Sequence, residues 1–474
     1  MDWRDFQRMQ GRRDFLTRCA GGIGIAALWN LLAEDGYAEP GAPALAPKAP
    51  HFPAKAKNVI FLFMEGGPSQ IDLFDPKPGM KRLDGQVLPE SLRKNLRFAF
   101  IKPTSKVWAS TQTFAKYGQS GMEFSSLLPQ LATCADDLCM VRSMFSDQFN
   151  HHPGQLLMHC GSPIVGRPSM GAWLLYGLGS ESQNLPGFVA LMSGRGGFAS
   201  SGLFTSGFLP SMYQGVPFAS TGEPIAYLSS PPGITQEEQR DRLDAIRQLN
   251  EAHYRDTGDA EIASRIASYE LAFRMQTAAP ELLDLSKETA ETQAQYGADT
   301  DNQFAKNCLL ARRMVERGVR FILVSHGSWD DHGSLQSGHK KNCEIVDQPC
   351  AALIRDLKQR GLLAQTLVIW GGEFGRTPLA QTLDPNKPSA TGRDHHPDAF
   401  TTLVTGGGIK PGTVVGRTDD IGLSVAEDKV HVHDLHATLL HCLGIEHTRL
   451  TFRYQGRNFR LTDVAGSVVR KMLA

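Results

Sequence analysis

The chain has 474 residues, 41% of them hydrophobic, and can therefore bury a large core as one big domain or two moderate ones. Its 49 lysines and arginines balance its 49 aspartates and glutamates, so no global field attracts the chain to nucleic acid or to an anionic membrane surface. The expected ligand is small or neutral, and nucleic acid is not an expected partner.

The N-terminus has the features of an export signal. Arg12 and Arg13 precede a modest apolar run rich in Gly and Ala, which resembles a signal for the twin-arginine export machinery. The run is too short and too Gly-rich for a stable membrane span, and the Pro/Ala-rich residues 38–57 suit a linker. An ordinary amphipathic helix is the alternative. We expect residues 1–50 to be signal and linker, residues 51–474 to be the functional domain, and the protein to be periplasmic or extracellular.

Short apolar runs then alternate with helical patterns. Residues 302–318 and 345–361 have helical spacing and end at Gly. This alternation predicts an α/β fold, a sandwich with a largely parallel central sheet, in which ligands bind beyond the carboxyl ends of the strands. The runs with the length and composition of buried strands are residues 58–64, 138–144, 188–192, 320–325, 366–370 and 400–407.

Residues 193–300 depart from this alternation. They begin with a Gly/Ser/Pro-rich section and continue as charged sequence with helical spacing, and no internal repeat is evident. We interpret them as an insertion that caps the sheet and not as an independent domain.

The cysteines do not form a metal-binding pattern. Of the eight, Cys19 lies in the signal, and none of the others makes a CxxC pair. An oxidising compartment permits disulfides such as Cys134–Cys139 or Cys343–Cys350, but buried thiols are the preferred interpretation.

Carboxylates and imidazoles follow the predicted strands. Glu65 ends the first strand, and Asp330 and His332 follow the strand at residues 320–325. Because Asp330 and His332 are two positions apart, both side chains project to the same side of an extended segment and can chelate an ion. Glu373 lies among glycines that allow the backbone to approach a ligand closely. A helix cap is the alternative role for either glutamate.

Two pairs of adjacent histidines each precede a proline. His151 and His152 stand in FNHHPGQ, and His395 and His396 stand in GRDHHPD. We predict that both pairs face one cleft, although a single histidine is more often a surface or hydrogen-bonded core residue. Imidazole and carboxylate ligands without thiolates suit zinc, manganese or iron.

Two arginines accompany these motifs. Arg376 follows Glu373 and Arg393 precedes the second histidine pair. We predict that both guanidinium groups bind an oxyanion or its ester by bidentate hydrogen bonds. The alternative is that they pair with carboxylates of the protein.

Long motifs resemble the exported, sulfatase-like family called domain of unknown function 1501. They include NVIFLFMEGGPSQIDLFDPKP, LIRDLKQRGLLAQTLVIWGGEFGRTP and GRDHHPDAF, and the resemblance spans nearly the whole mature chain. That family is similar to the alkaline phosphatase superfamily, which includes sulfatases and phosphatases. The resemblance implies a three-layer α/β sandwich of the alkaline phosphatase/sulfatase type and a divalent metal ion such as zinc, manganese or calcium.

The resemblance also implies roles for individual residues. Glu65 falls where the superfamily ends its first strand with a metal-binding Asp, and Glu373 falls where it has Asp followed by His, here Phe374. The metal ligands implied in this way are Glu65, Asp330, His332, Glu373, His395 and His396.

The usual nucleophile of sulfatases has no counterpart. His151 stands where those enzymes carry a Cys, and no Cys, Ser or Thr occupies the position. In a first reading, metal-bound water attacks a sulfate or phosphate ester, with His151 or His152 as ligand or general acid/base. In a second, the hydroxyl of Ser146 takes over. In a third, catalysis is lost and the protein binds a sulfated or phosphorylated glycan or a partner protein.

Overall fold

The computed structural model describes residues 45–93, 98–219, 225, 233–382 and 386–474. The chain divides into two compact units, residues 1–46 and 47–474, and the second contains the predicted functional domain. The expected export signal around Arg12 and Arg13 lies outside the described residues. In the described part of the chain, no helix is long and apolar enough to cross a membrane.

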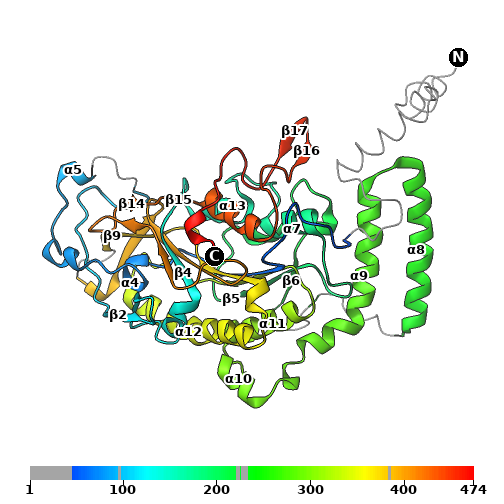
Figure 1. Ribbon diagram of the computed structural model, residues 1–474, viewed down its shortest axis with the longest axis horizontal. Helices are drawn as coiled ribbons and strands as arrows, with labels where there is room; N and C mark the ends of the chain where they lie inside the picture. The colour runs from blue at the N-terminus through cyan, green and yellow to red at the C-terminus, as the bar shows by residue number, and fades with distance from the viewer. Residues whose placement is uncertain (1–44, 94–97, 220–224, 226–232, 383–385) are drawn as a thin grey trace. The chain divides into compact units, whose positions relative to one another are not determined.

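A nine-stranded mixed sheet forms the centre of residues 47–474 (Figure 1). β11 is antiparallel to both of its neighbours, whereas every other pairing in this sheet is parallel. The expected α/β fold with a largely parallel sheet is therefore confirmed. The strand order is β12 (Thr413–Val415), β4 (Leu138–Phe145), β11 (Phe400–Thr405), β8 (Thr366–Gly371), β1 (Asn58–Met64), β7 (Phe321–His326), β5 (Phe188–Ser193) and β6 (Val216–Phe218), and β15 (Val430–His431) also pairs with β4.

Helices cover both faces of the sheet (Figure 1). Successive residues of β1 point to opposite faces, and all seven are buried. Ile60 and Leu62 belong to a core cluster with residues of α11 (Gln303–Glu316) and α12 (Leu335–Gln359). Phe61 and Phe63 instead contact His159 of α6. The helices of this second face are α6 (His151–Cys160), α7 (Met170–Leu178) and α13 (Val432–Cys442).

The first ten residues of α12 were not expected to be helical. The helix begins at Leu335, whereas the apolar pattern in the sequence begins at residue 345. Two of the buried positions in these first turns are the polar His339 and Asn342, so the apolar periodicity is weak there.

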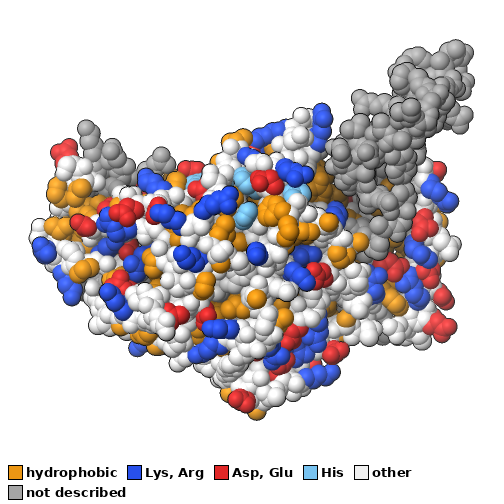
Figure 2. All heavy atoms as spheres, in the orientation of Figure 1, with side chains coloured by type: hydrophobic (Ala, Val, Ile, Leu, Met, Phe, Trp, Pro, Cys, Tyr) orange, Lys and Arg blue, Asp and Glu red, His pale blue; other side chains and the backbone are white. Residues whose placement is uncertain are grey.

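Residues 193–300 contribute both to the sheet and to a helical hairpin. β6 extends the sheet beside β5, while α8 (Gln236–Thr257) and α9 (Ala260–Leu283) pack against each other, followed by α10 (Ala290–Tyr296). No residue of α8 is buried. On the face shown in Figure 2, acidic and basic side chains are interspersed, in keeping with the balanced charge.

The remaining elements are short. All seven described cysteines are buried and free, so the disulfides that the sequence permits are absent and the preference for buried thiols is confirmed. The short helices are α4 (Gln70–Leu73) and α5 (Glu90–Arg93), and the strands outside the main sheet are β2 (Phe114–Tyr117), β3 (Met122–Ser125), β9 (Gly375–Thr382), β10 (Thr391–His396), β13 (Arg417–Thr418), β14 (Val425–Glu427), β16 (Phe452–Tyr454) and β17 (Arg457–Phe459).

Strand direction brings several loops to one edge of the sheet. The carboxyl ends of β1, β4, β5, β7 and β8 meet there because these strands are mutually parallel. β11 runs the other way, so the segment that precedes it lies at the same edge. This arrangement positions the site described next.

Candidate metal centre

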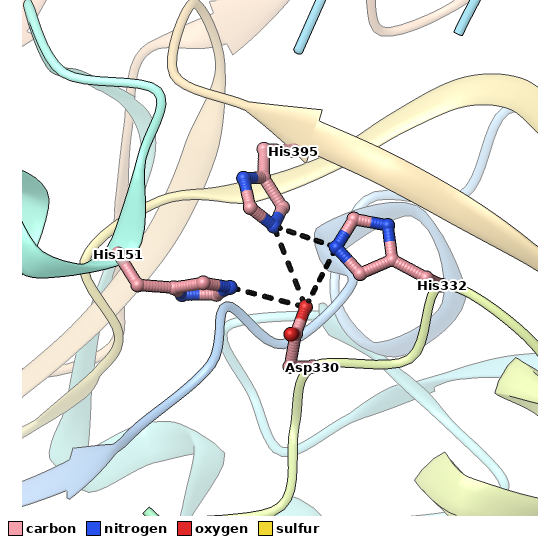
Figure 3. A group of neighbouring side chains, drawn as sticks. All are labelled: His151, Asp330, His332 and His395. Atoms are coloured by element: carbon pink, nitrogen blue, oxygen red, sulfur yellow. Dashed lines mark hydrogen bonds and ion pairs between the residues drawn. The ribbon is translucent and has the colours of Figure 1, made fainter. Parts of the chain in front are cut away.

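Four side chains converge at this edge of the sheet (Figure 3). His151 is the first residue of α6, whose start is capped by the side chain of Asn150. Asp330 and His332 lie in the loop after β7, and His395 lies in β10. One ligand atom from each of the four side chains lies within 4.8 Å of the others.

Two glycines let these segments approach one another. Gly66 has a φ of +118°, and a Cβ there would lie 2.6 Å from the amide nitrogen of Asp330. A Cβ on Gly392 would lie 2.2 Å from the carbonyl carbon of His332. Any larger residue at either position would push the loop after β7 away from its neighbours.

The distances within the group match a single four-coordinate ion. Asp330 Oδ1 lies 3.0 Å from His332 Nε2, 3.1 Å from His151 Nε2 and 3.4 Å from His395 Nε2. His332 Nε2 and His395 Nε2 are 2.9 Å apart. Tetrahedral zinc, with metal–ligand bonds of about 2.0–2.1 Å, places its ligand atoms about 3.3 Å from one another.

Each imidazole is oriented by an acceptor at its other nitrogen. We assign the Nδ1 proton of all three histidines from these partners, so each Nε2 carries a lone pair directed into the group. Such outer partners are typical of metal-binding histidines. The acceptors are Glu373 Oε1 for His151 (2.7 Å), Gln381 Oε1 for His332 (2.6 Å) and the carbonyl oxygen of Phe149 for His395 (2.7 Å).

This donor set fits a metal cation. With both Nδ1 atoms protonated, the lone pairs of His332 Nε2 and His395 Nε2 face each other and repel unless a proton or a cation lies between them. His151 Nε2 is buried and makes no hydrogen bond, although Asp330 Oδ1 is within ion-pair distance. Buried polar atoms without partners are rare. A metal ion at the centre of the group would accept the lone pairs of all three Nε2 atoms.

The protonation states of the group follow from its burial and charges. Burial raises the pKa of Asp330, but the three histidines outweigh burial and hold that pKa far below its usual range. Burial lowers the pKa of His395 to about 4, so this side chain is a neutral ligand at neutral pH. Burial also opposes charge on His151, but the carboxylates of Asp330 and Glu373 raise its pKa to about 9. In the metal-free protein at neutral pH His151 is therefore also protonated at Nε2, and that lone pair becomes available when a cation displaces the proton.

Three predicted metal ligands lie outside the group. Glu373 is fully buried and accepts hydrogen bonds from His151 Nδ1, Gln155 Nε2 (3.2 Å) and the amide of Gly66 (3.1 Å), so it orients a ligand. Glu65 accepts hydrogen bonds from the backbone amides of residues 197 and 198. His396 Nε2 donates to the carbonyl oxygen of Gly422 (3.0 Å).

The two arginines predicted to bind substrate have partners within the protein, as in the alternative interpretation of the sequence. Both are fully buried. Arg376 donates to Asp330 Oδ1 (2.7 Å) and to the backbone carbonyls of residues 66, 67, 329 and 393. Arg393 pairs with Asp72 (2.9 Å), whose pKa it holds below the usual range against the opposite effect of burial, and stacks on Trp108 (4.6 Å). Their donors are therefore directed into the protein.

The histidine pairs split between two environments, and one member of each pair lies in the group of four side chains. His151 enters the group, whereas His152, one position further along α6, is exposed. His395 enters the group, whereas the neighbouring His396 points elsewhere in β10. Adjacent residues of a helix or a strand point in different directions.

Several residues of the site carried no signal in the sequence. Gln381 and the carbonyl group of Phe149 orient two ligands: Gln381 lies outside the motifs singled out in the sequence, and the backbone carbonyl of Phe149 acts without regard to its side chain. Phe374 stacks on His395 with ring centroids 4.5 Å apart. Phe198 stacks on His151 at 4.3 Å. These contacts depend on chain segments that are distant in sequence.

The fold and the site together define an α/β protein with a candidate metal centre of three histidines and one aspartate. Residues 56–473 match the family described as "Protein of unknown function (DUF1501)", and the chain belongs to that family, as the resemblance indicated. No curated protein matches the chain.

Solved structures of the alkaline phosphatase superfamily are similar to the chain at low identity. The lipoteichoic acid synthase LtaP from Listeria monocytogenes has a TM-score of 0.37 and 11% identity, covering 88% of this chain and 78% of its own. The PsFucS1 sulfatase from Pseudoalteromonas sp. has a TM-score of 0.35 and 12% identity, and the match covers 89% of this chain and 70% of the sulfatase. The phosphonate monoester hydrolase SpPMH from Silicibacter pomeroyi has a TM-score of 0.35 and 12% identity, and the match covers 82% of this chain and 73% of the hydrolase. Such distant likenesses carry no argument about function.

Proposed function

We propose that the protein is a hydrolase of sulfate or phosphate esters that works with one divalent cation. The observation that carries this proposal is the convergence of three imidazole nitrogens and one carboxylate oxygen, each oriented by further protein groups. The donor set favours zinc or manganese over calcium, which prefers six to eight oxygen ligands. When bound, the cation supplies Lewis-acid polarisation and lowers the pKa of water.

The chain's own residues would hold this site rigid. Glu373 fixes the ring of His151, and Arg376 fixes the carboxylate of Asp330 from a fully buried position. Phe374 covers one face of His395 and keeps water from that side of the ring. The side chains of Asp330 and His332 are 28% and 23% exposed, so an ester would reach the group from their side.

The general acid/base is a separate part of this proposal. His152 follows the ligand His151 in the sequence and is exposed, and we assign it as the candidate for proton transfer to the leaving oxygen, although it lies outside the ligand group. The hydroxyl of Ser146 is a weaker candidate for the nucleophile, because its oxygen already accepts a hydrogen bond from the amide of Gln148 (3.2 Å).

A second candidate function is binding without turnover. One observation favours it: the two arginines near the group are engaged by protein partners. In that case the protein would bind a sulfated glycan or another anionic ester at a structural cation.

An ester screen separates the two candidates. We would assay the metal-loaded protein on 4-nitrophenyl sulfate, 4-nitrophenyl phosphate and a phosphonate monoester, with and without a chelator. The hydrolase predicts turnover of at least one ester that disappears on chelation and in the Asp330→Ala variant. Stoichiometric metal without turnover of any ester supports the binding function, and failure to bind metal contradicts both.

A further inference from the structure

Two exposed phenylalanines lie directly against the ligand imidazoles. Phe198 is 48% exposed and stacks on His151, with ring centroids 4.3 Å apart and an interplanar angle of 12°. Phe100 is 62% exposed and meets His332 and His395 edge-on at 5.2 and 5.4 Å. Each ring therefore contacts the cluster and also presents apolar surface to solvent at the same place.

Buried carboxylates hold both rings in position. Glu65, 2% exposed, accepts hydrogen bonds from the amides of Gly197 and Phe198. Asp394, fully buried, does the same for the loop that carries Phe100. A carboxylate that accepts several backbone N–H groups fixes the conformation of the loop that supplies them. The amides bound by Asp394 Oδ2 are those of Ala99 (2.9 Å), Phe100 (2.8 Å) and Ile101 (3.2 Å).

The two loops also carry charge of one sign. Lys102 follows the loop that carries Phe100, and Arg195 begins the loop that carries Phe198; both side chains are exposed. The two apolar rings lie beside the partly exposed side chains of Asp330 and His332, and each of the two chain segments that supply the rings also contains an exposed basic residue. An aromatic face binds another ring by offset or edge-on stacking, while a cation attracts an oxyanion.

We propose that Phe100 and Phe198 form a subsite for the ring of the substrate's alcohol, so that the substrate is an anionic ester of a phenol or of a sugar with an apolar ring face. This inference rests on the proposed function, because it places the ester group at the metal centre. Glu65 and Asp394 are positioning residues that act through the two loops. An acyclic ester of the same acid would lack the stacking contact.

Phosphonates that are not hydrolysed test this directly. We would titrate the zinc-loaded protein with phenylphosphonate and with methylphosphonate by calorimetry. Stacking on one ring predicts about a two- to tenfold gain in affinity, so with contacts to both rings phenylphosphonate should bind at least about fourfold more tightly than methylphosphonate. Phe100→Leu and Phe198→Leu should each weaken phenylphosphonate about two- to tenfold and leave methylphosphonate and zinc content unchanged.

A control and two contrary outcomes complete the test. Tyr254→Leu replaces an aromatic side chain of similar exposure (42%) on α8 and should change neither affinity. Thermal melting monitored by circular dichroism checks that each variant is folded. Equal binding of both phosphonates, with no effect of the leucine variants, would overturn the ring subsite and leave the proposed function standing. If zinc-loaded protein binds neither phosphonate, the anion site itself is absent and both proposals fail.

Discussion

Gln381 provides a clean test of how the metal centre is built, because its side chain is only half-buried and it orients a ligand without being one. Its Oε1 accepts the Nδ1 proton of His332 at 2.6 Å. The neighbouring Thr382 is exposed at the same end of β9 and serves as the matched control. Gln381→Ala removes the acceptor and leaves the ring of His332 free to rotate away from the ion.

The expected magnitude follows from the geometry of this hydrogen bond. A neutral hydrogen bond contributes about 0.5–1.5 kcal/mol, and loss of a partner behind a metal ligand typically weakens metal binding about 10- to 100-fold. Since water can replace the half-buried amide, we expect the lower end, about tenfold or 1.4 kcal/mol. Gln381→Glu places a carboxylate behind the imidazole and should strengthen binding relative to Gln381→Ala.

The assay is competition for zinc against a chromophoric chelator at pH 7.5. Wild type and Thr382→Ala should bind with the same affinity, and Gln381→Ala should bind about tenfold more weakly. If Gln381→Ala binds zinc as tightly as the wild type, His332 is not held as a ligand in the way described, and the reasoning is refuted.

Further predictions concern stability and the neighbouring histidines. Arg393→Ala leaves the buried carboxylate of Asp72 without its partner and should lower the free energy of unfolding by about 3–5 kcal/mol in urea denaturation. An unchanged free energy of unfolding together with a raised KM would instead indicate that this arginine binds substrate. Burial lowers the pKa of His159 and of His436 to about 3, below the 6.5 of the unfolded chain. The unfolded state therefore binds more protons than the folded state below pH 6.5, so each residue should lower the free energy of unfolding by about 2 kcal/mol on acidification from pH 7.5 to pH 5. Urea denaturation at the two pH values measures this loss. An equal loss of stability in wild type and in His159→Gln would contradict it. His151→Ala should lose metal, whereas the exposed His152→Ala should keep it, as elemental analysis of both variants will reveal.

Much of the fold could be predicted because its strands are buried on both faces. The run NVIFLFM has no polar interruption and matches β1 residue for residue, and the apolar run at 320–325 lies within one residue of β7. The start of α12 could not be predicted in the same way, because its first buried positions include His339 and Asn342. A polar side chain in a buried position leaves no apolar periodicity to detect.

The site was predictable where strand direction alone decides it. Asp330 and His332 follow a parallel strand, and His395 precedes the antiparallel β11, so all three reach one edge. Which member of a histidine pair points inward depends on the local backbone, which adjacency in sequence does not reveal. The partners of Glu65 could not be predicted, because they are backbone amides at residues 197 and 198, in a Gly-rich segment whose path no local pattern encodes.

The arginines show why residue type alone did not decide their role. Arg376 and Arg393 stand in the motifs that carry the candidate ligands, and a guanidinium group suits an oxyanion. Their complete burial and their carbonyl and carboxylate partners became visible only in the folded structure. A guanidinium group whose donors face protein acceptors has none left for a ligand.

The central claim is that one divalent cation is bound by His151, Asp330, His332 and His395, and its most direct test is the metal content of the purified protein. We would measure it by elemental analysis beside His332→Ala and the control His152→Ala. The account predicts about one ion per chain in the wild type and in His152→Ala, and its loss in His332→Ala. Wild-type protein that stays free of metal after reconstitution with zinc and manganese, or a His332→Ala variant that retains the ion, would contradict it.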